Sequence, residues 1–305
     1  MKIAELQYKI DLVNDIFDYE REWVELANVA ETGVFLSWEW VSSWASFVEN
    51  QLFICTVKSS EEVVSMGFLT LLDVTRHSVM QVKQLRLHST GVADTDQVWP
   101  EYNGMLVQPG FELLVYQGLV AFLKTTKFKW DELVVGPITS EVFSMLRLSG
   151  LHAVELWRAP AYKVDFLNIK GQAGFLETLS KNTRQQIRRS MTHYRNEGEL
   201  IIKVASTKAD AIEFFHSLGV IHKQRWGNES GFRNDCFIRF HLLMIERCYD
   251  SGTVELLRLE VNGEVLGYLY NFFFSNTAYF YMSGILPSKQ NKLKPGLVFH
   301  SMCVD

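Results

Sequence analysis

The chain has 305 residues, which is long enough for two domains of ordinary size. Hydrophobic residues make up 48% of the sequence and charged residues 21%, so a sizeable core is available. The net charge of −5 argues against a general nucleic-acid binder, although it leaves room for a local basic patch.

The cysteines and the apolar segments indicate a cytoplasmic protein. None of the four cysteines forms a C-x-x-C pair, so we expect reduced thiols. The N-terminus lacks the continuous apolar core of a signal peptide. The aromatic run 265–285 is too often interrupted, by Asn271, Ser275 and Asn276, to span a membrane. The cysteines are Cys55, Cys236, Cys248 and Cys303.

The first half predicts a strand, two helices and three more strands, followed by a long loop. Asp11 and Ser37 are plausible N-caps of the two helices. Beyond the loop we expect a helix, a short strand, a helix and a further strand. These elements are predicted at 2–10, 11–30, 37–48, 52–58, 63–73, 79–87, 111–124, 132–135, 139–148 and 154–166.

The loop at 88–103 is the first candidate for a site. Long loops in compact domains are usually functional or disordered, and this one holds Trp99, Glu101 and Tyr102 beside a histidine and two aspartates. The composition favours a substrate-facing loop. A purely structural Ω-loop is an equal alternative.

A domain junction is predicted at 171–174, which gives domains of 1–170 and 171–305. The helix predicted at 180–196 places Lys181, Arg184, Arg188 and Arg195 on one face. Arginine suits phosphate, so this stripe indicates anion recognition. A solvated basic face is the alternative.

The remaining sequence predicts a strand at 200–204, helices at 208–226 and 235–249, and strands at 255–261, 265–274 and 277–285. Asn262-Gly263 is a two-residue hairpin signal. A basic loop with Lys289, Lys292 and Lys294 leads to a helix that begins at Pro295. Unpaired N–H groups, lysines and Gly296 would suit a phosphate or pyrophosphate, whereas a solvated turn is the alternative.

The two halves repeat the same order of elements: a strand, two helices, three strands, a loop and a helix introduced by Pro-Gly. The dipeptide occurs as Pro109-Gly110 and Pro295-Gly296. The second copy ends inside its apolar helix, so we expect a truncated second domain.

This order resembles the GNAT acyltransferase fold. The sequence is similar to the tandem-GNAT family named after a cellulose-biosynthesis (CelD-like) acetyltransferase, and more distantly to the Fem aminoacyltransferases. The similar stretches are Phe35-Leu36-Ser37-Trp38-Glu39-Trp40 with Trp44, Trp99-Pro100-Glu101-Tyr102-Asn103, Leu179-Ser180-Lys181-Asn182-Thr183-Arg184 with Arg188-Arg189, Arg225-Trp226, and Tyr281-Met282-Ser283-Gly284 with Pro295-Gly296. The resemblance implies a mixed α/β fold of two tandem GNAT domains.

The resemblance also implies transfer of an acyl group from acetyl-CoA to an amine or hydroxyl of a saccharide or cell-envelope precursor, in polysaccharide synthesis. The pantetheine arm would lie along Tyr281, Met282, Ser283 and Gly284, and the pyrophosphate would meet Asn291, Lys292, Lys294 and Gly296. The usual loop motif is Gln/Arg-x-x-Gly-x-Gly/Ala. Asn291, Lys294 and Gly296 occupy those places, so only the last fits.

Direct transfer needs a base, and His222 and Glu101 are the candidates, each with a structural role as the alternative. No Ser-His-Asp order, zinc spacing or P-loop is present, so no metal is expected. Substrate contacts are expected from Arg184, Arg188, Arg225, Trp226, Trp99 and Tyr102.

Two other functions remain open. A Fem-like transferase would use aminoacyl-tRNA and contact it through the arginine helix, with binding that weakens as salt rises. A non-catalytic GNAT-like scaffold would instead bind a partner in polysaccharide synthesis.

Overall fold

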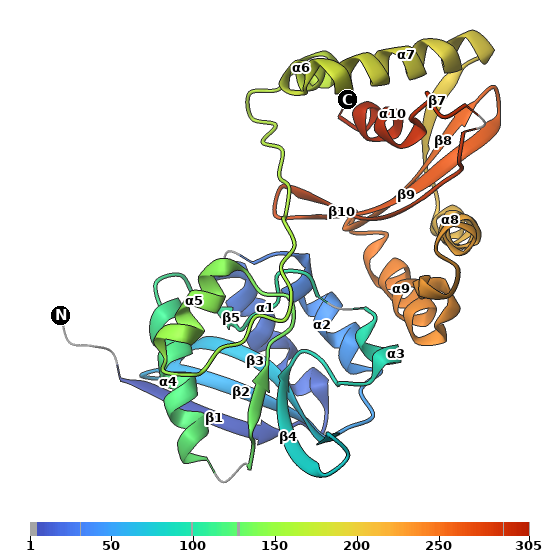
Figure 1. Cartoon of the computed structure of the whole chain (residues 1–305). Helices are drawn as coiled ribbons and strands as arrows, with labels where there is room; N and C mark the ends of the chain where they lie inside the picture. The colour runs from blue at the N-terminus through green and yellow to red at the C-terminus, as the bar shows by residue number, and fades with distance from the viewer. Residues whose placement is uncertain (1–4, 31, 99, 127–128, 289, 305) are drawn as a thin grey trace. The chain divides into compact units, whose positions relative to one another are not determined.

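The structure is a computed structural model that describes residues 5–30, 32–98, 100–126, 129–288 and 290–304. The chain divides into two units (Figure 1). Unit 1 comprises the chain up to Leu156 and the segment Asp235–Met244, and unit 2 comprises Trp157–Asn234 and the chain from Ile245 onward. The predicted boundary after residue 170 stays a prediction, and residues 171–174 begin a helix.

Unit 1 is built on one mixed sheet with the order β1-β2-β3-β4-β6, and β5 pairs with β3. All neighbouring strands are antiparallel except β4 and β6, which run parallel. The strands are β1 (Leu6–Leu12), β2 (Leu52–Ser59), β3 (Glu62–Arg76), β4 (Met80–Leu87), β5 (Leu106–Val107) and β6 (Glu132–Val134).

Helices cover both faces of this sheet. On one face Val115 and Leu119 of α4 pack with Cys55 and Leu85 in a buried cluster. On the other face Trp23 of α1 stacks on Phe68 with 5.1 Å between the ring centres. The helical segments are η1 (Ile16–Tyr19), α1 (Glu20–Val29), η2 (Val34–Leu36), α2 (Trp38–Ala45), α3 (Ala93–Asp96), α4 (Glu112–Thr125) and α5 (Ser140–Leu148).

Unit 2 is built on a four-stranded antiparallel sheet with the order β10-β9-β8-β7. Its strands are β7 (Leu200–Val204), β8 (Val254–Val261), β9 (Glu264–Phe274) and β10 (Thr277–Ile285). Its helical segments are α6 (Gly171–Thr178), α7 (Lys181–Glu197), α8 (Lys208–Trp226), η3 (Gly227–Glu229), η4 (Gly231–Arg233) and α10 (Pro295–Met302), while α9 (Asp235–Cys248) is divided between the units.

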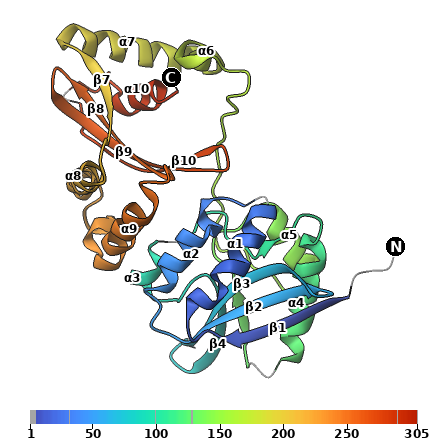
Figure 2. The same cartoon turned by 180° about the vertical axis from the view of Figure 1, so that it is seen from behind.

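The two faces of the unit 2 sheet have different covers, as Figures 1 and 2 show. Helices α7 and α10 lie on one face, where Ile187 and Phe299 pack against Leu269 of β9 in a buried cluster. Helix α8 lies on the other face, where Phe215 contacts Tyr270 with 5.9 Å between the ring centres. Because side chains alternate along a strand, Leu269, Asn271 and Phe273 of β9 face α7 and α10.

The predicted strands and hairpins are largely confirmed, and so is the repeat. Both units contain a strand, helices and three antiparallel strands in the same sheet order. The predicted turn at Asn262-Gly263 has φ values of 50° and 81°, as a type I′ turn requires. Ser37 caps α2, since its Oγ accepts a hydrogen bond from the Trp40 N–H at 3.2 Å.

Two local predictions were wrong. Residues 154–166 form no strand, because no described strand pairs with them and Pro160 removes a backbone donor. Asp11 lies in β1 and caps no helix. Asp15 caps the short helix η1 instead, since its Oδ1 accepts a hydrogen bond from the Phe17 N–H at 2.9 Å, and α1 has no side-chain cap.

Candidate functional site

The loop at 286–294 leads into α10 and leaves the start of that helix open. Pro295 is the first helical residue, as predicted, and no side chain caps the N-terminus at Lys294. A Cβ atom added at Gly296 would meet no heavy atom within 4 Å. The first turn of α10 therefore offers N–H groups and a positive dipole end beside open space.

Helix α7 holds this loop in place. The Arg189 guanidinium donates a hydrogen bond to the Lys292 carbonyl oxygen. The Lys294 N–H donates to Ser190 Oγ at 3.0 Å, and that hydroxyl in turn donates to the Gln186 carbonyl at 2.8 Å. The predicted basic stripe omits Arg189 and Ser190, because nothing in the local sequence shows that α7 and the loop are neighbours.

The predicted arginine stripe divides into two roles. Arg184 donates to the carbonyl oxygens of Glu177 and Leu179, both at 3.0 Å, so it stabilises the turn between α6 and α7. Arg188 is exposed, as are Lys292 and Lys294 of the loop, while Lys289 lies outside the described residues. Exposed positive charge is thus spread along α7, at Lys181, Arg188, Arg189 and Arg195, and is also present on the loop.

Strand β10 is irregular at the predicted pantetheine segment. The register with β9 shifts between Phe280 and Met282, which places Tyr281 in a β-bulge. The Tyr281 ring contacts Phe272 edge-on, with 5.3 Å between the ring centres. Ser283 lies opposite Leu269 on the face of α7 and α10. No described strand pairs with the outer edge of β10.

Gly284 has a packing reason of its own. A Cβ atom there would lie 2.7 Å from the Leu218 carbonyl oxygen and 3.2 Å from the Cβ of Ile221, both on α8. Real Cβ atoms do not approach backbone oxygen so closely. The absent side chain thus allows α8 to lie directly on β10.

One end of α8 brings His222, Arg225 and Trp226 together. His222 Nδ1 lies 2.8 Å from the Oγ of buried Ser230, and burial, followed by the charge of Arg225, lowers the pKa of His222. The Arg225 guanidinium lies over the half-exposed Trp226 ring, 5.2 Å from its centre. His222 is therefore neutral near pH 7, with one ring nitrogen engaged.

The other predicted contacts belong to unit 1. Tyr102 is 45% exposed with a φ of 56°, and its ring centre lies 6.3 Å from that of Phe35. Partial burial raises the pKa of Glu101. Trp99 lies outside the described residues. His222 and Glu101 thus belong to different units.

His88 and Asn103 support the structural interpretation of the 88–103 loop. The Phe68 N–H donates to His88 Nε2 at 3.0 Å, so Nδ1 carries the proton and donates to Asn103 Oδ1 at 2.8 Å. Burial lowers the pKa of His88 to about 4. The Asn103 amide donates to the carbonyls of Leu87 and Val135 at 3.0 and 2.8 Å, so it bridges the chain after β4 and β6.

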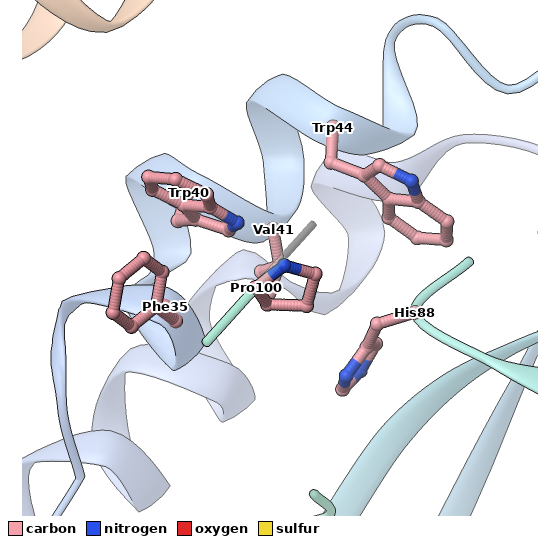
Figure 3. Close-up of a pocket in the computed structure, with 6 residues that line it drawn as sticks. All are labelled: Phe35, Trp40, Val41, Trp44, His88 and Pro100. Carbon is pink, nitrogen blue, oxygen red and sulfur yellow. The ribbon is translucent and has the colours of Figure 1, made fainter. Parts of the chain in front are cut away.

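An apolar pocket lies beside this histidine (Figure 3). Phe35, Trp40, Val41, Trp44, His88 and Pro100 line it. Trp44 and His88 lie edge-on with 6.1 Å between their ring centres. The pocket has no space for a water molecule, so it is a small packing gap in the core and cannot hold a ligand.

Within the described residues no three His, Cys, Asp or Glu side chains are grouped as metal ligands. No described helix combines the length and the hydropathy that a membrane crossing needs.

Comparisons with known proteins bear on the fold. The family model described as "Acetyltransferase (GNAT) domain" matches residues 181–305. Among solved structures, FemX is similar over 97% of this chain and 85% of its own, with 10% identity and a TM-score of 0.56. A tandem GNAT protein from the clavulanic acid biosynthesis pathway is aligned over 97% of this chain and 83% of its own, with 13% identity and a TM-score of 0.42.

A conserved protein of unknown function from Bacteroides thetaiotaomicron is aligned over 97% of this chain and 87% of its own, with 10% identity and a TM-score of 0.49. No curated protein matches the sequence. The chain therefore has the mixed α/β fold of FemX, and its segment from α7 to α10 matches the GNAT acetyltransferase domain.

Proposed function

We propose that this protein transfers an acyl group from acyl-CoA to an acceptor and that unit 2 binds the acyl-CoA. The observation that carries the proposal is the match of residues 181–305 to the GNAT domain, because that segment contains the open start of α10. GNAT domains use acyl-CoA as a co-substrate.

The described residues fit the pyrophosphate of CoA. The N–H groups of the first turn of α10 would bind its oxygens, and Lys292 and Lys294 would balance its charge. Gly296 leaves the space that the phosphates need. Arg189 and Ser190 fix the loop beforehand, so little ordering entropy opposes binding.

The pantetheine arm would lie along the outer edge of β10, at Tyr281, Met282, Ser283 and Gly284. An edge strand presents backbone donors and acceptors that an amide-containing arm can bind. In the reaction the acceptor nitrogen or oxygen attacks the thioester carbonyl. The new bond to carbon forms, the C–S bond breaks, and the thiolate takes up the proton that the acceptor loses. Backbone donors at the same edge would stabilise the oxyanion.

The described residues of unit 1 offer no comparable open helix start, which is why we assign the acyl-CoA to unit 2. At the corresponding helix start, the Glu112 carboxylate accepts a hydrogen bond from the Gly110 N–H at 2.8 Å. This carboxylate occupies the position of a bound anion and repels a phosphate. The Asn103 amide also fills the space between the ends of β4 and β6.

The acceptor side is proposed at the end of α8. Arg225 and Trp226 form an exposed cationic and aromatic surface that suits a saccharide or a cell-envelope precursor. His222 is the proposed base, because it belongs to unit 2 with the proposed acyl-CoA site. A cytoplasmic role in polysaccharide synthesis, as in the cellulose-biosynthesis acetyltransferase family, is part of this proposal.

Calorimetry with acetyl-CoA tests the cofactor site. We expect micromolar binding. Lys294→Glu should weaken it roughly tenfold or more, because it replaces a positive charge that attracts the phosphates with a negative charge that repels them. Gly296→Val should also weaken it. Lys223→Glu is the matched control, since it makes the same charge change on exposed α8. Absence of binding by the wild-type protein would rule out the proposal.

A Fem-like transferase that uses aminoacyl-tRNA is the second candidate. Exposed Arg188 and Arg195 on α7 favour it. Neither forms an ion pair with a carboxylate in the described structure, so both guanidinium groups could contact RNA phosphates. Filter binding of tRNA over a salt series separates the two. A steep salt dependence that Arg188→Ala reduces would favour tRNA, whereas binding of neither ligand would leave the scaffold function.

A further inference from the structure

The segment between α5 and α6 exposes more large apolar side chains than any other stretch of its length in the described structure. Seven such residues are exposed between Val154 and Leu167. Tyr162, Val164 and Phe166 are 90%, 45% and 48% exposed. The segment forms neither helix nor strand (Figure 1). A contiguous exposed apolar surface marks an interaction site, so this segment needs a partner.

Residues 161–166 have the sequence pattern and the free backbone of a β-strand. Tyr162, Val164 and Phe166 alternate with Lys163 and Asp165, which would place the apolar side chains on one face and the charges on the other. No residue in this range has a positive φ. None of their backbone N–H groups donates a hydrogen bond in the described structure. Such a segment can add to another strand.

This strand-like segment is bounded at both ends. Pro160 has no N–H group, so it cannot continue a ladder of hydrogen bonds in that direction. At the other end the Phe166 carbonyl oxygen accepts a hydrogen bond from the Ile169 N–H at 3.0 Å. The Phe166 ring also contacts Phe175 of α6, with 6.4 Å between the ring centres. The free stretch therefore has the ordinary length of a strand, and α6 anchors its end.

The charges select the partner and the register. We consider an antiparallel pair with the same segment of a second copy, centred on Val164. Lys163 then lies opposite the partner subunit's Asp165, and Tyr162 lies opposite the partner subunit's Phe166, which are both stabilising neighbours. Centring on Lys163 or on Asp165 would place like charges opposite each other. A register shift of one residue would set charged side chains against apolar ones.

We propose that residues 161–166 are a dimerisation strand that pairs antiparallel with residues 161–166 of a second copy. The two-fold axis passes between the two Val164 residues, so the interface is self-complementary and closes at two chains. Neither Lys163 nor Asp165 forms an ion pair within the described chain, so both are available to the partner. The interface goes beyond the proposed acyl transfer and does not rest on it. Because a two-stranded ribbon is only marginally stable by itself, the dimer is weak, with a Kd on the order of 10–100 µM.

Sedimentation equilibrium of the full chain, between about 1 and about 300 µM, measures the dimer. Lys163→Asp and Asp165→Lys should each weaken dimerisation roughly tenfold or more, because like charges then lie opposite each other. The double variant exchanges the two charges and restores opposite pairs, so it should dimerise more tightly than either single variant. Lys170→Asp, at the start of α6, is the matched control and should leave the dimer unchanged.

Hydrogen exchange locates the contact. We expect the amides of residues 161–166 to exchange more slowly as the protein concentration rises. A monomer throughout the concentration range would overturn the proposal, and so would a dimer that neither single substitution weakens or that the double variant fails to restore. Protection of these amides in a monomer would show instead that a strand edge of the same chain covers the segment. Acetyl-CoA binding is measured separately, so its absence would reject the proposed function and leave the dimer standing.

Discussion

The Oγ atom of Ser190, in the middle of α7, lies 3.0 Å from the backbone nitrogen of Lys294, immediately before α10. The two residues are 104 positions apart in the sequence. Ser190 is fully buried, so this hydrogen bond is shielded from water. It fixes the position from which the first turn of α10 begins, and with it the proposed phosphate site.

Ser190→Ala removes that bond and leaves the Lys294 N–H without its acceptor. We expect a loss of about 1 kcal/mol in the free energy of unfolding and roughly fivefold weaker acetyl-CoA binding, because the loop is no longer held. Urea unfolding and calorimetry measure the two effects. Thr192→Ala on the exposed face of α7 is the control and should change neither. Unchanged affinity in Ser190→Ala would mean that the loop needs no anchor.

The pH dependence of stability gives a second prediction. Burial lowers the pKa of His88 to about 4, against an unfolded value near 6.5, so the unfolded state binds the proton first. The contribution of His88 is complete above pH 6.5 and is lost as the pH falls towards 4. His88→Gln should therefore lose less stability than the wild type between pH 7 and pH 5, by up to about 2 kcal/mol.

Urea unfolding at the two pH values provides the comparison. Burial lowers the pKa of His241 to about 3, so the variant keeps part of the acid sensitivity. An identical loss in both proteins would show that His88 is already solvated in the native state.

The sequence predicts most strands and turns because their signals are local. Asn262-Gly263 specifies its turn through two positive φ values, and Ser37 specifies the start of α2 through one hydrogen bond. The partners of Ser190 and Asn103 could not be predicted, since each contact joins segments far apart in the chain. The loop at 88–103 shows why composition alone is a weak guide to function. Its polar residues suggested a binding surface, yet His88 and Asn103 are buried and hydrogen-bonded to each other.

Gly284 gives a third prediction, which separates packing from ligand binding. Gly284→Ala would place a Cβ atom 2.7 Å from the Leu218 carbonyl, so α8 or β10 must shift at a cost of about 1–3 kcal/mol. Gly296→Ala is the matched control, because its Cβ atom would meet nothing within 4 Å. Thermal unfolding should show a lowered Tm only for Gly284→Ala. Equal Tm values would mean that the space beneath α8 is larger than described.

Asn103→Ala tests whether unit 1 can be destabilised without an effect on the acyl-CoA site proposed in unit 2. The substitution removes the donors of two buried carbonyls, those of Leu87 and Val135, and the acceptor of His88. We expect unit 1 to lose about 2–4 kcal/mol, because each orphaned buried group costs about 1–3 kcal/mol. Hydrogen exchange should quicken at β4 and β6.

Acetyl-CoA binding should stay unchanged in the same variant, provided that it remains folded, because the proposed site belongs to unit 2. Asn103→Asp is the companion variant: it keeps an acceptor for His88 but turns a carboxylate oxygen towards the two carbonyls, so it should be no more stable than alanine. A folded Asn103→Ala protein that no longer binds acetyl-CoA would place the cofactor in unit 1. The Glu112 carboxylate at the start of α4 would then have to move away from the Gly110 N–H to admit a phosphate.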